Sequence, residues 1–211
     1  MQSNSREEIL NRIAAVRPKR IAAIDIQPSE NEKIYKPILP DAISCFKSEL
    51  EAINGQCILC EDESDQFLKI IDFLKSKDLP TIFCRDSNII KQLSKAGIST
   101  TNNPADFENM QAGITTCEFL VARTGSVIVS SAGESGRQMN VFPPIHIVIA
   151  KASQLVDFLT DALVAMQTKY GKELPSTLST ITGPSRTADI EKTLVLGAHG
   201  PKEFIVFLSK I

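Results

Sequence analysis

The fold is decided by residues 57–97, CILCEDESDQFLKIIDFLKSKDLPTIFCRDSNIIKQLSKAG. Two short apolar runs, 57–60 and 81–84, have the length and composition of buried strands. Between them, residues 64–76 place apolar side chains on one face of a helix, and Asp86 is suited to cap a second helix. Strands and helices that alternate at this spacing indicate βαβ units. We therefore expect a three-layer α/β/α fold with a mainly parallel sheet flanked by helices.

The rest of the chain continues this alternation. A helix is expected to begin after Asp41 and to be closed by Gly55, and the helix that follows Asp86 is expected to end at Gly97. A long amphipathic helix is predicted from Ser153 to Gly171. Further strands are predicted at 113–116, 127–130, 145–150, 178–182 and 204–208, and a short helix at 187–194.

Composition places the chain among ordinary globular proteins. It has 211 residues, a formal net charge of −2 and 43% hydrophobic residues, which fits one large domain. No basic excess points to a nucleic-acid partner, and no apolar stretch approaches the ~20 residues of a membrane span. The polar N-terminus is unlike a signal peptide, so we expect a cytoplasmic protein whose five cysteines are free thiols.

Two regions are expected along the chain. Ser5 and Glu8 form a capping box at the start of a helix, and Pro18 stops that helix. We assign residues 1–36 to an N-terminal helical arm and linker, and residues 37–211 to a single domain. Because the arm could pack on a second chain, the sequence is compatible with a homo-oligomer.

The first candidate site is the polar segment TGPSRTADIE at 182–191. It is predicted to run from a strand through a tight turn at Gly183 into the N-terminus of a helix. Ser185 or Thr187 would cap that helix, and its free amides would join the Arg186 guanidinium to seat a carboxylate or phosphate. Open α/β sheets bind ligands at the carboxyl ends of strands, which is where we expect this turn. The alternative is a capped loop in which Arg186 pairs with an acidic residue of the same segment.

The second candidate is His199, which lies between Gly197 and Gly200 on a predicted loop. A loop histidine titrates near neutral pH and can transfer a proton. The alternative is a plain surface turn. Its closeness in sequence to Arg186 favours a shared pocket.

Three weaker candidates lie between residues 118 and 137. Glu118 is a carboxylate within an apolar segment, either at a sheet edge or a functional acid. The turn Thr124-Gly125-Ser126 carries two hydroxyl groups. The Gly- and Ser-rich segment 132–137 could act as a lid, with Arg137 holding an anion, although a solvated loop is the default interpretation of such a segment.

The pair Cys57 and Cys60 is not interpreted as a redox or metal motif. Residues three apart on a strand point to opposite faces, and the sequence has no second CxxC. We predict no metal site, and the lack of a second CxxC also argues against an iron–sulfur cluster, which usually takes four cysteine ligands. His146 lies in an apolar strand and is expected to be a hydrogen-bonded core residue.

Four segments together resemble the lactate-utilisation protein C family, which carries the LUD domain. They are Thr124–Val127, Phe142–Val148, Gly183–Glu191 and Gly197–Pro201, and the resemblance covers roughly residues 40–211. It implies a fold similar to the NagB/RpiA/CoA-transferase-like group. It also implies a part in the conversion of L-lactate to pyruvate by a bacterial multi-subunit system whose other subunits carry iron–sulfur clusters. No catalytic residue is established for this subunit, so the resemblance transfers motif positions but no mechanism.

The leading hypothesis is a non-redox subunit that binds a small hydroxy or keto acid or organises iron–sulfur partner subunits. His199 and Glu118 are its candidate catalytic residues. The candidate ligand-binding residues are Thr124, Gly125, Ser126, Arg137, Gly183, Ser185, Arg186, Thr187, Asp189 and Gly200. The alternatives are an independent enzyme of the CoA-transferase or sugar-phosphate isomerase type, with Glu118 or Glu134 as nucleophile, and a scaffold without a ligand site.

Overall fold

The structure is a computed structural model that describes residues 5–16, 37–79, 81–187 and 195–211. The chain divides into two compact units, residues 1–37 and 38–211. The first unit contains helix α1, Ser5–Val16, in which Arg12 pairs with Glu8 one turn earlier. The linker predicted over residues 17–36 lies outside the described residues. The second unit contains all the other described elements.

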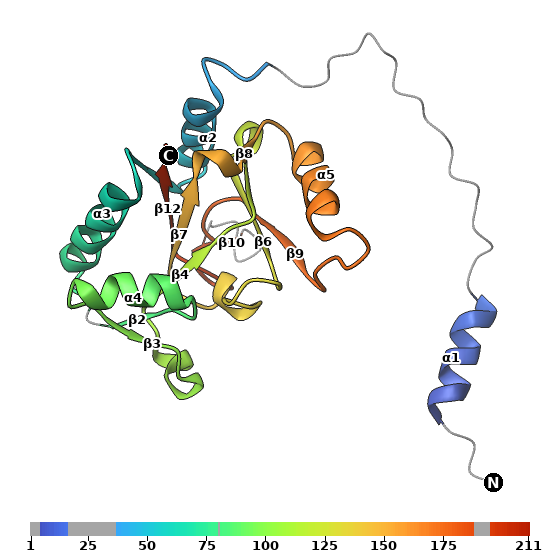
Figure 1. The fold of residues 1–211 in the computed structure, drawn as a ribbon. Helices are drawn as coiled ribbons and strands as arrows, with labels where there is room; N and C mark the ends of the chain where they lie inside the picture. Colours follow the sequence, from blue (N-terminus) through green and yellow to red (C-terminus); the bar gives the residue numbers. More distant parts are fainter. Residues whose placement is uncertain (1–4, 17–36, 80, 188–194) are drawn as a thin grey trace. The chain divides into compact units, whose positions relative to one another are not determined.

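A six-stranded sheet forms the centre of the second unit (Figure 1). Its strands lie in the order β1-β12-β7-β4-β2-β3, and all neighbouring pairs are parallel. The strands are β1 Gln56–Cys60, β2 Thr81–Phe83, β3 Ser99–Thr101, β4 Ala112–Thr116, β7 Ile145–Lys151 and β12 Glu203–Ser209. The parallel sheet and the flanking helices predicted from sequence are confirmed.

Helices α3 (Glu63–Ser76) and α4 (Ser87–Lys95) cover one face of this sheet. Asp86 caps α4 as predicted, because its carboxylate accepts hydrogen bonds from the amides of Asn88 and Ile89. Between these helices and the strands lies a core that is largely aliphatic. Its fully buried members include Ile70, Leu74, Ile82, Leu93, Ile114, Ile147, Ile205 and Phe207.

The opposite face is covered by helix α2 (Ala42–Ala52) and by a second sheet of four strands. The order in that sheet is β8-β5-β6-β9, and helix α5 packs on its outer side (Figure 1). The elements are β5 Phe119–Val121, β6 Ser126–Ser130, β8 Leu155–Val156, α5 Leu159–Tyr170 and β9 Leu178–Ile181. This second sheet was not predicted as a separate layer.

Short elements complete the fold. Four 3-10 helices are described: η1 Pro104–Asn109, η2 Ala122–Thr124, η3 Gln138–Asn140 and η4 Ala152–Gln154. Strands β10 (Arg186–Thr187) and β11 (Val195–Leu196) form an antiparallel pair. Among the described helices, none is both long enough and apolar enough to cross a membrane.

Two helix boundaries differ from the sequence-based prediction. The helix expected from Ser153 begins only at Leu159, because Leu155 and Val156 pair with strand β5 instead. After α2 the left-handed residue is Asn54, with a φ of 66°, and not Gly55. Gly55 is needed for space, since a Cβ there would lie 2.3 Å from Leu50 Cδ1.

The helix predicted at 187–194 is wrong at its first residue. Thr187 belongs to strand β10, where it pairs with Val195. Residues 188–194 lie outside the described residues. Among the described residues 183–187, no helix begins at Ser185 or Arg186.

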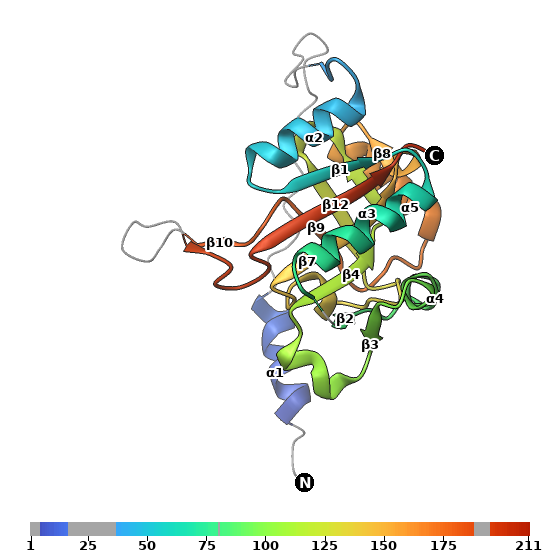
Figure 2. The same cartoon turned by 90° about the vertical axis from the view of Figure 1, so that its left-hand side faces the viewer.

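Since all six central strands run in one direction, the main sheet has an amino edge, where strands begin, and a carboxyl edge, where they end. In Figure 2, strand β12 ends near the chain's C-terminus at the right, which is the carboxyl edge, and β10 projects at the left, beyond the amino edge. The candidate residues around Arg186 and His199 lie at the amino edge, and Glu118 lies at the carboxyl edge.

Candidate functional site

The segments 183–187 and 197–201 lie side by side, as expected from their closeness in sequence. The Ser185 amide donates to the Pro201 carbonyl at 2.8 Å, and the Gly197 amide donates to the Ser185 carbonyl at 2.9 Å. Gly200 permits this approach, because a Cβ there would lie 3.0 Å from Ser185 Cβ. The ligand-binding role of these residues stays a prediction.

This pair of segments lies at the amino edge, and not at the carboxyl end of a parallel strand as predicted. The amides of Lys202 and Glu203 donate to the Pro144 carbonyl, just where β12 and β7 begin. Gly183 has a positive φ of 78°, which suits the tight turn predicted there, but it follows β9 of the second sheet. The rule that places ligands at carboxyl ends applies to the parallel sheet, so it does not favour this location.

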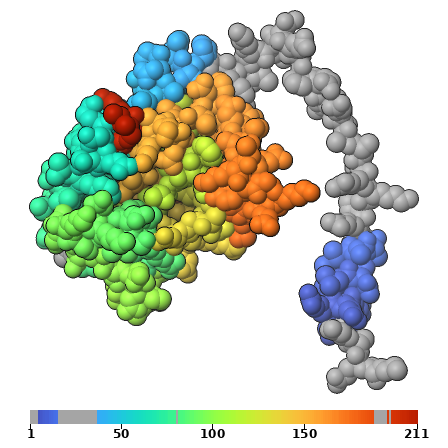
Figure 3. All heavy atoms as spheres, viewed as in Figure 1, coloured from blue at the N-terminus to red at the C-terminus, as the bar shows by residue number. Residues whose placement is uncertain are grey.

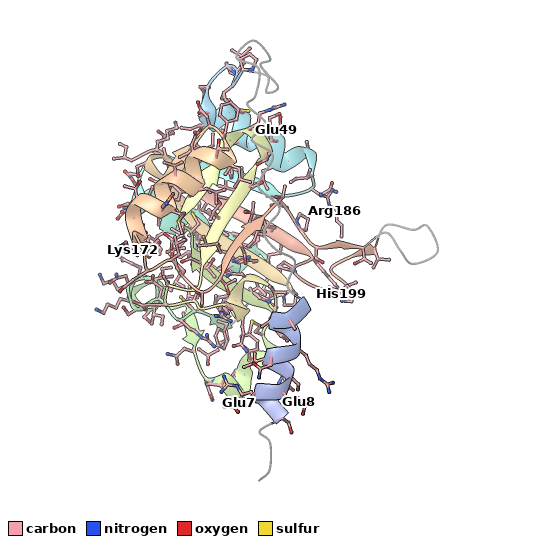
Figure 4. All side chains as sticks on the ribbon, turned by 90° about the vertical axis from the view of Figure 1, so that its right-hand side faces the viewer. Glu7, Glu8, Glu49, Lys172, Arg186 and His199 are labelled. Atoms are coloured by element: carbon pink, nitrogen blue, oxygen red, sulfur yellow. The ribbon has the colours of Figure 1, made fainter. Side chains whose placement is uncertain are left out.

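A cavity of about 370 Å³ opens at the amino edge beside His199. It is lined by Val141, Phe142, Pro144, Gly197, Ala198, His199, Gly200 and Lys202. His199 and Arg186 are both exposed, and Figure 4 places them on the same side of the fold. Asp189, the remaining predicted member of this group, lies outside the described residues.

Glu118 lies at the carboxyl edge, two residues beyond the end of β4. Its Oε1 accepts hydrogen bonds from Ser130 Oγ at 2.5 Å and from the Tyr170 hydroxyl at 2.7 Å. Its Oε2 accepts from Lys169 Nζ at 2.6 Å. Only 9% of the Glu118 side chain is exposed, whereas that of Lys169 is 54% exposed. Three segments distant in sequence therefore meet at one carboxylate.

This environment keeps Glu118 ionised. Burial by itself would raise the pKa of the carboxyl group, but hydrogen bonds from Lys169, Ser130 and Tyr170 outweigh it and lower the pKa below its usual value. The pKa of Lys169 is raised, mainly by its hydrogen bond to Glu118. Near neutral pH the pair is a carboxylate and an ammonium group.

A polar cavity of about 210 Å³ adjoins this carboxylate. In Figure 3, which faces the carboxyl edge, the yellow segment near residues 130–140 and the orange helix α5 border a yellow-green patch of surface. The cavity is lined by Thr116, Cys117, Glu118, Val129, Ser130, Ala132, Gly133, Ser135, Asn140, Lys169 and Tyr170. Ser135 and Asn140 are buried polar residues, so this cavity has a polar wall as well as a charged pair.

The segment 132–137 is held in place at this edge. The Glu134 carboxylate accepts a hydrogen bond from the Ser87 amide at 3.0 Å, which satisfies an amide in the first turn of α4. Arg137, predicted to hold an anion, is exposed and donates to the Ser176 hydroxyl. Both side chains have structural partners, and their ligand roles stay predictions.

The turn at 124–126 has a packing role. The Ser126 hydroxyl is hydrogen-bonded to Thr124 Oγ1 and to Thr182 Oγ1, each at 2.8 Å. Gly125 has a φ of 58°, and a Cβ there would lie 2.3 Å from the Leu50 amide nitrogen. Helix α2 can therefore approach this hairpin only because residue 125 is glycine.

Glu118 and His199 cannot belong to one site, because they lie at opposite edges of the main sheet. Figure 4 shows the separation through Lys172, two residues beyond α5, which lies on the opposite side of the fold from His199. Strand β12 has seven residues and so spans roughly 20 Å between the edges. The two candidate catalytic residues are thus alternatives.

Sequence reasoning missed Ser130, Lys169 and Tyr170 as partners of Glu118. One signal was available for Tyr170. It follows the buried residues Ala162 and Met166 at a spacing of four, which places it on the inward face of α5. Nothing local to residues 169–170 indicates Glu118 as the partner.

His146 is a hydrogen-bonded core residue, as predicted, and Cys57 and Cys60 lie on opposite faces of the sheet, as expected for residues three apart on a strand. His146 is fully buried, its Nε2 is 2.8 Å from Thr115 Oγ1, and its Nδ1 finds no partner among the described residues. Cys57 and Cys60 belong to the cores on opposite faces of the sheet. Within the described parts of the chain, no group of three or more histidine, cysteine or acidic side chains is arranged to hold a metal ion.

Part of this chain is similar to known proteins. It is 40% identical over 91 residues to lactate utilization protein C 1 of Bacillus mycoides, covering 42% of this chain and 39% of the relative. It is 38% identical over 96 residues to lactate utilization protein C of Bacillus subtilis, covering 44% of this chain and 40% of the relative. The matched part thus spans about two-fifths of the length of these relatives.

Structural similarity and a family model extend the match over more of the chain. A crystal structure of a DUF162 family protein from Deinococcus radiodurans aligns with a TM-score of 0.60 and 16% identity, covering 80% of this chain and 96% of that one. That likeness shows the fold. The model of the LUD domain matches residues 43–209, so this chain belongs to the LUD domain family.

Proposed function

We propose that this chain is a non-redox component of lactate utilisation that binds a short 2-hydroxy or 2-oxo acid at the carboxyl edge. The observation that carries the proposal is the cavity of about 210 Å³ that is lined by a largely buried carboxylate, an ammonium group and several neutral polar groups. The process is suggested by the names of the relatives, lactate utilization protein C. The location agrees with the tendency of parallel sheets to bind ligands where their strands end.

The size of the cavity favours a small ligand. At roughly 30 Å³ for each water molecule, its volume corresponds to about seven waters. A three-carbon hydroxy acid has a comparable number of non-hydrogen atoms. Pockets for drug-sized ligands usually exceed about 300 Å³, so a large substrate would have to extend outside this cavity.

The chemistry of the lining assigns a role to each group. Lys169 would hold the carboxylate of the ligand, because an ammonium group has three donors and Glu118 takes one of them. Asn140 and Ser135 supply neutral polar contacts. Glu118, with its lowered pKa, is a weak base at neutral pH and would orient the ligand, leaving proton removal to another group.

The redox part of the reaction is assigned to other chains. Oxidation of a 2-hydroxy acid to a 2-oxo acid releases two electrons and two protons. In this proposal the electrons pass to partner subunits that carry iron–sulfur clusters, and this chain presents the acid to them or organises them.

Binding measurements on two variants test the location of the site. Isothermal titration calorimetry would be run with L-lactate and with pyruvate on wild type, Lys169→Met and Arg186→Ala. We expect binding to wild type and Arg186→Ala and at least a tenfold loss in Lys169→Met, because a charged hydrogen bond contributes roughly 1.5–3 kcal/mol. The reverse pattern would place the ligand at the amino edge beside His199. Absence of binding to wild type would refute the proposal.

A second candidate function is an acyl-transfer enzyme of the CoA-transferase type. It is favoured by one observation, namely that Glu118 is ionised and borders a cavity, as a carboxylate nucleophile must. Glu134 is less suited, since its carboxylate binds the first turn of α4. Incubation with acyl-CoA followed by peptide mass spectrometry would show an acyl or CoA adduct on Glu118 if this function is correct. A sugar-phosphate isomerase would instead turn over sugar phosphates without an adduct.

A further inference from the structure

We propose that the Glu118 cavity selects 2-hydroxy acids over the corresponding 2-oxo acids, because Glu118 presents one remaining acceptor position to the ligand. This inference rests on the proposed function and specifies the ligand class of the same site. Its basis is the set of hydrogen bonds around the carboxylate together with the small volume of the cavity.

The acceptor capacity of Glu118 is almost fully used. An ionised carboxylate accepts about four hydrogen bonds, two on each oxygen. Oε1 accepts from Ser130 and Tyr170, and Oε2 accepts from Lys169. No further donor from the described residues reaches Oε2, so one position on it stays open. It adjoins the cavity, since both Glu118 and Lys169 line it.

This open position distinguishes a hydroxyl group from a carbonyl group. A 2-hydroxyl can donate its proton to Oε2 while the ligand carboxylate binds Lys169. A 2-oxo group has only lone pairs, which would face the lone pairs and negative charge of Oε2. Because only 9% of the Glu118 side chain is exposed, water cannot easily separate the two oxygens. The ionised carboxyl group has no proton of its own to donate.

The arrangement also restricts the size of the ligand at this position. Ser130 and Tyr170 hold Oε1 at 2.5 and 2.7 Å, so the carboxylate cannot rotate to offer another geometry without losing both bonds. A methyl ether in place of the hydroxyl would remove the donor and add volume to a cavity of about 210 Å³. Such an ether is therefore a second probe of the same acceptor.

The test compares three ligands on the full chain by isothermal titration calorimetry: L-lactate, pyruvate and (S)-2-methoxypropanoate. We expect wild type to bind L-lactate at least roughly tenfold more tightly than either of the others, because a charged hydrogen bond is lost. In Glu118→Gln the amide can both donate and accept, so the preference for L-lactate over pyruvate is expected to fall to within about threefold. The matched control Glu61→Gln, at an exposed carboxylate that pairs with Lys210 and does not line this cavity, should keep the wild-type preference.

The outcomes separate this inference from the proposal on which it rests. Equal affinity of wild type for L-lactate and pyruvate, or tighter binding of pyruvate, would overturn the inference and leave the small-acid site standing. No binding of any of the three ligands would overturn both. Since the comparison of ligands on wild type needs no variant, the inference remains testable even if Glu118→Gln does not fold.

Discussion

The buried imidazole of His146 makes the stability of this protein depend on pH in a defined window. Burial without a charged partner lowers the pKa of His146 from its usual 6.5 to about 3. The unfolded chain therefore gains a proton below pH 6.5 that the folded chain does not take up until about pH 3. The stability associated with this group is present above pH 6.5 and is lost as the pH falls through that window.

The size of the effect follows from the two pKa values. Each pKa unit corresponds to about 1.36 kcal/mol, so protonation of the unfolded chain removes about 2 kcal/mol of unfolding free energy between pH 7 and pH 5. A domain is typically stable by roughly 5–15 kcal/mol, which makes this loss measurable. The carboxyl groups with lowered pKa, Asp41, Asp65 and Glu118, act mostly at lower pH, because their ordinary values are 3.8 and 4.5.

Urea unfolding at pH 7 and pH 5 tests this reasoning in wild type and in His146→Gln. Glutamine can still hydrogen-bond Thr115 but does not gain a proton, so we expect the variant to lose about 2 kcal/mol less than wild type between the two pH values. The readout is a difference between conditions, so a lower stability of the variant at pH 7 does not affect it. Equal losses in wild type and His146→Gln would refute the assignment.

Two further predictions concern packing. Gly125→Ala should lower the unfolding free energy by about 3 kcal/mol, because alanine disfavours the left-handed backbone there and its Cβ would overlap Leu50. Gly97→Ala is the control, since residue 97 has a φ of 75° but nothing lies near the new Cβ, and it should cost only about 1 kcal/mol. Both losses are measured by urea unfolding. Equal losses in the two variants would contradict the close approach of α2. Burial raises the pKa of Cys57 to about 12 and that of Cys60 to about 11. Iodoacetamide at pH 8 should therefore label both thiols in urea and neither in the native protein. Labelling is read by mass spectrometry, and labelling of the native protein would contradict the burial of these thiols.

The part of the fold predicted correctly from sequence depends on local rules. The runs at 57–60 and 81–84 contain the partly buried strands β1 and β2, and the amphipathic segment between them is a helix. Asp41 and Asp86 cap their helices because an aspartate side chain accepts from amides two or three residues ahead. These features need only neighbours in sequence, so a single sequence is sufficient to find them.

The second sheet could not be predicted in the same way. Leu155 and Val156 fit the apolar face of the helix that follows, and their helical spacing gives no reason to separate them from it. They form a strand because β5, more than thirty residues earlier, offers its edge to them. A pairing across that distance leaves no periodic signal of its own, and tertiary context decides it.

The candidate site shows why dense motifs and site location can differ. The segments with the most recognisable glycines each have a packing reason: Gly125 lies against α2, Gly183 against Ile53, and Gly200 against Ser185. A glycine motif records a close approach of backbones, and a close approach can serve the fold as well as a ligand. The Glu118 cluster needs no glycine and no continuous motif, because single residues from β6 and α5 reach one carboxylate across 12, 51 and 52 positions. The sequence singles out Glu118 as a lone acid in an apolar segment, but its partners Ser130, Lys169 and Tyr170 can be recognised only after the chain has folded.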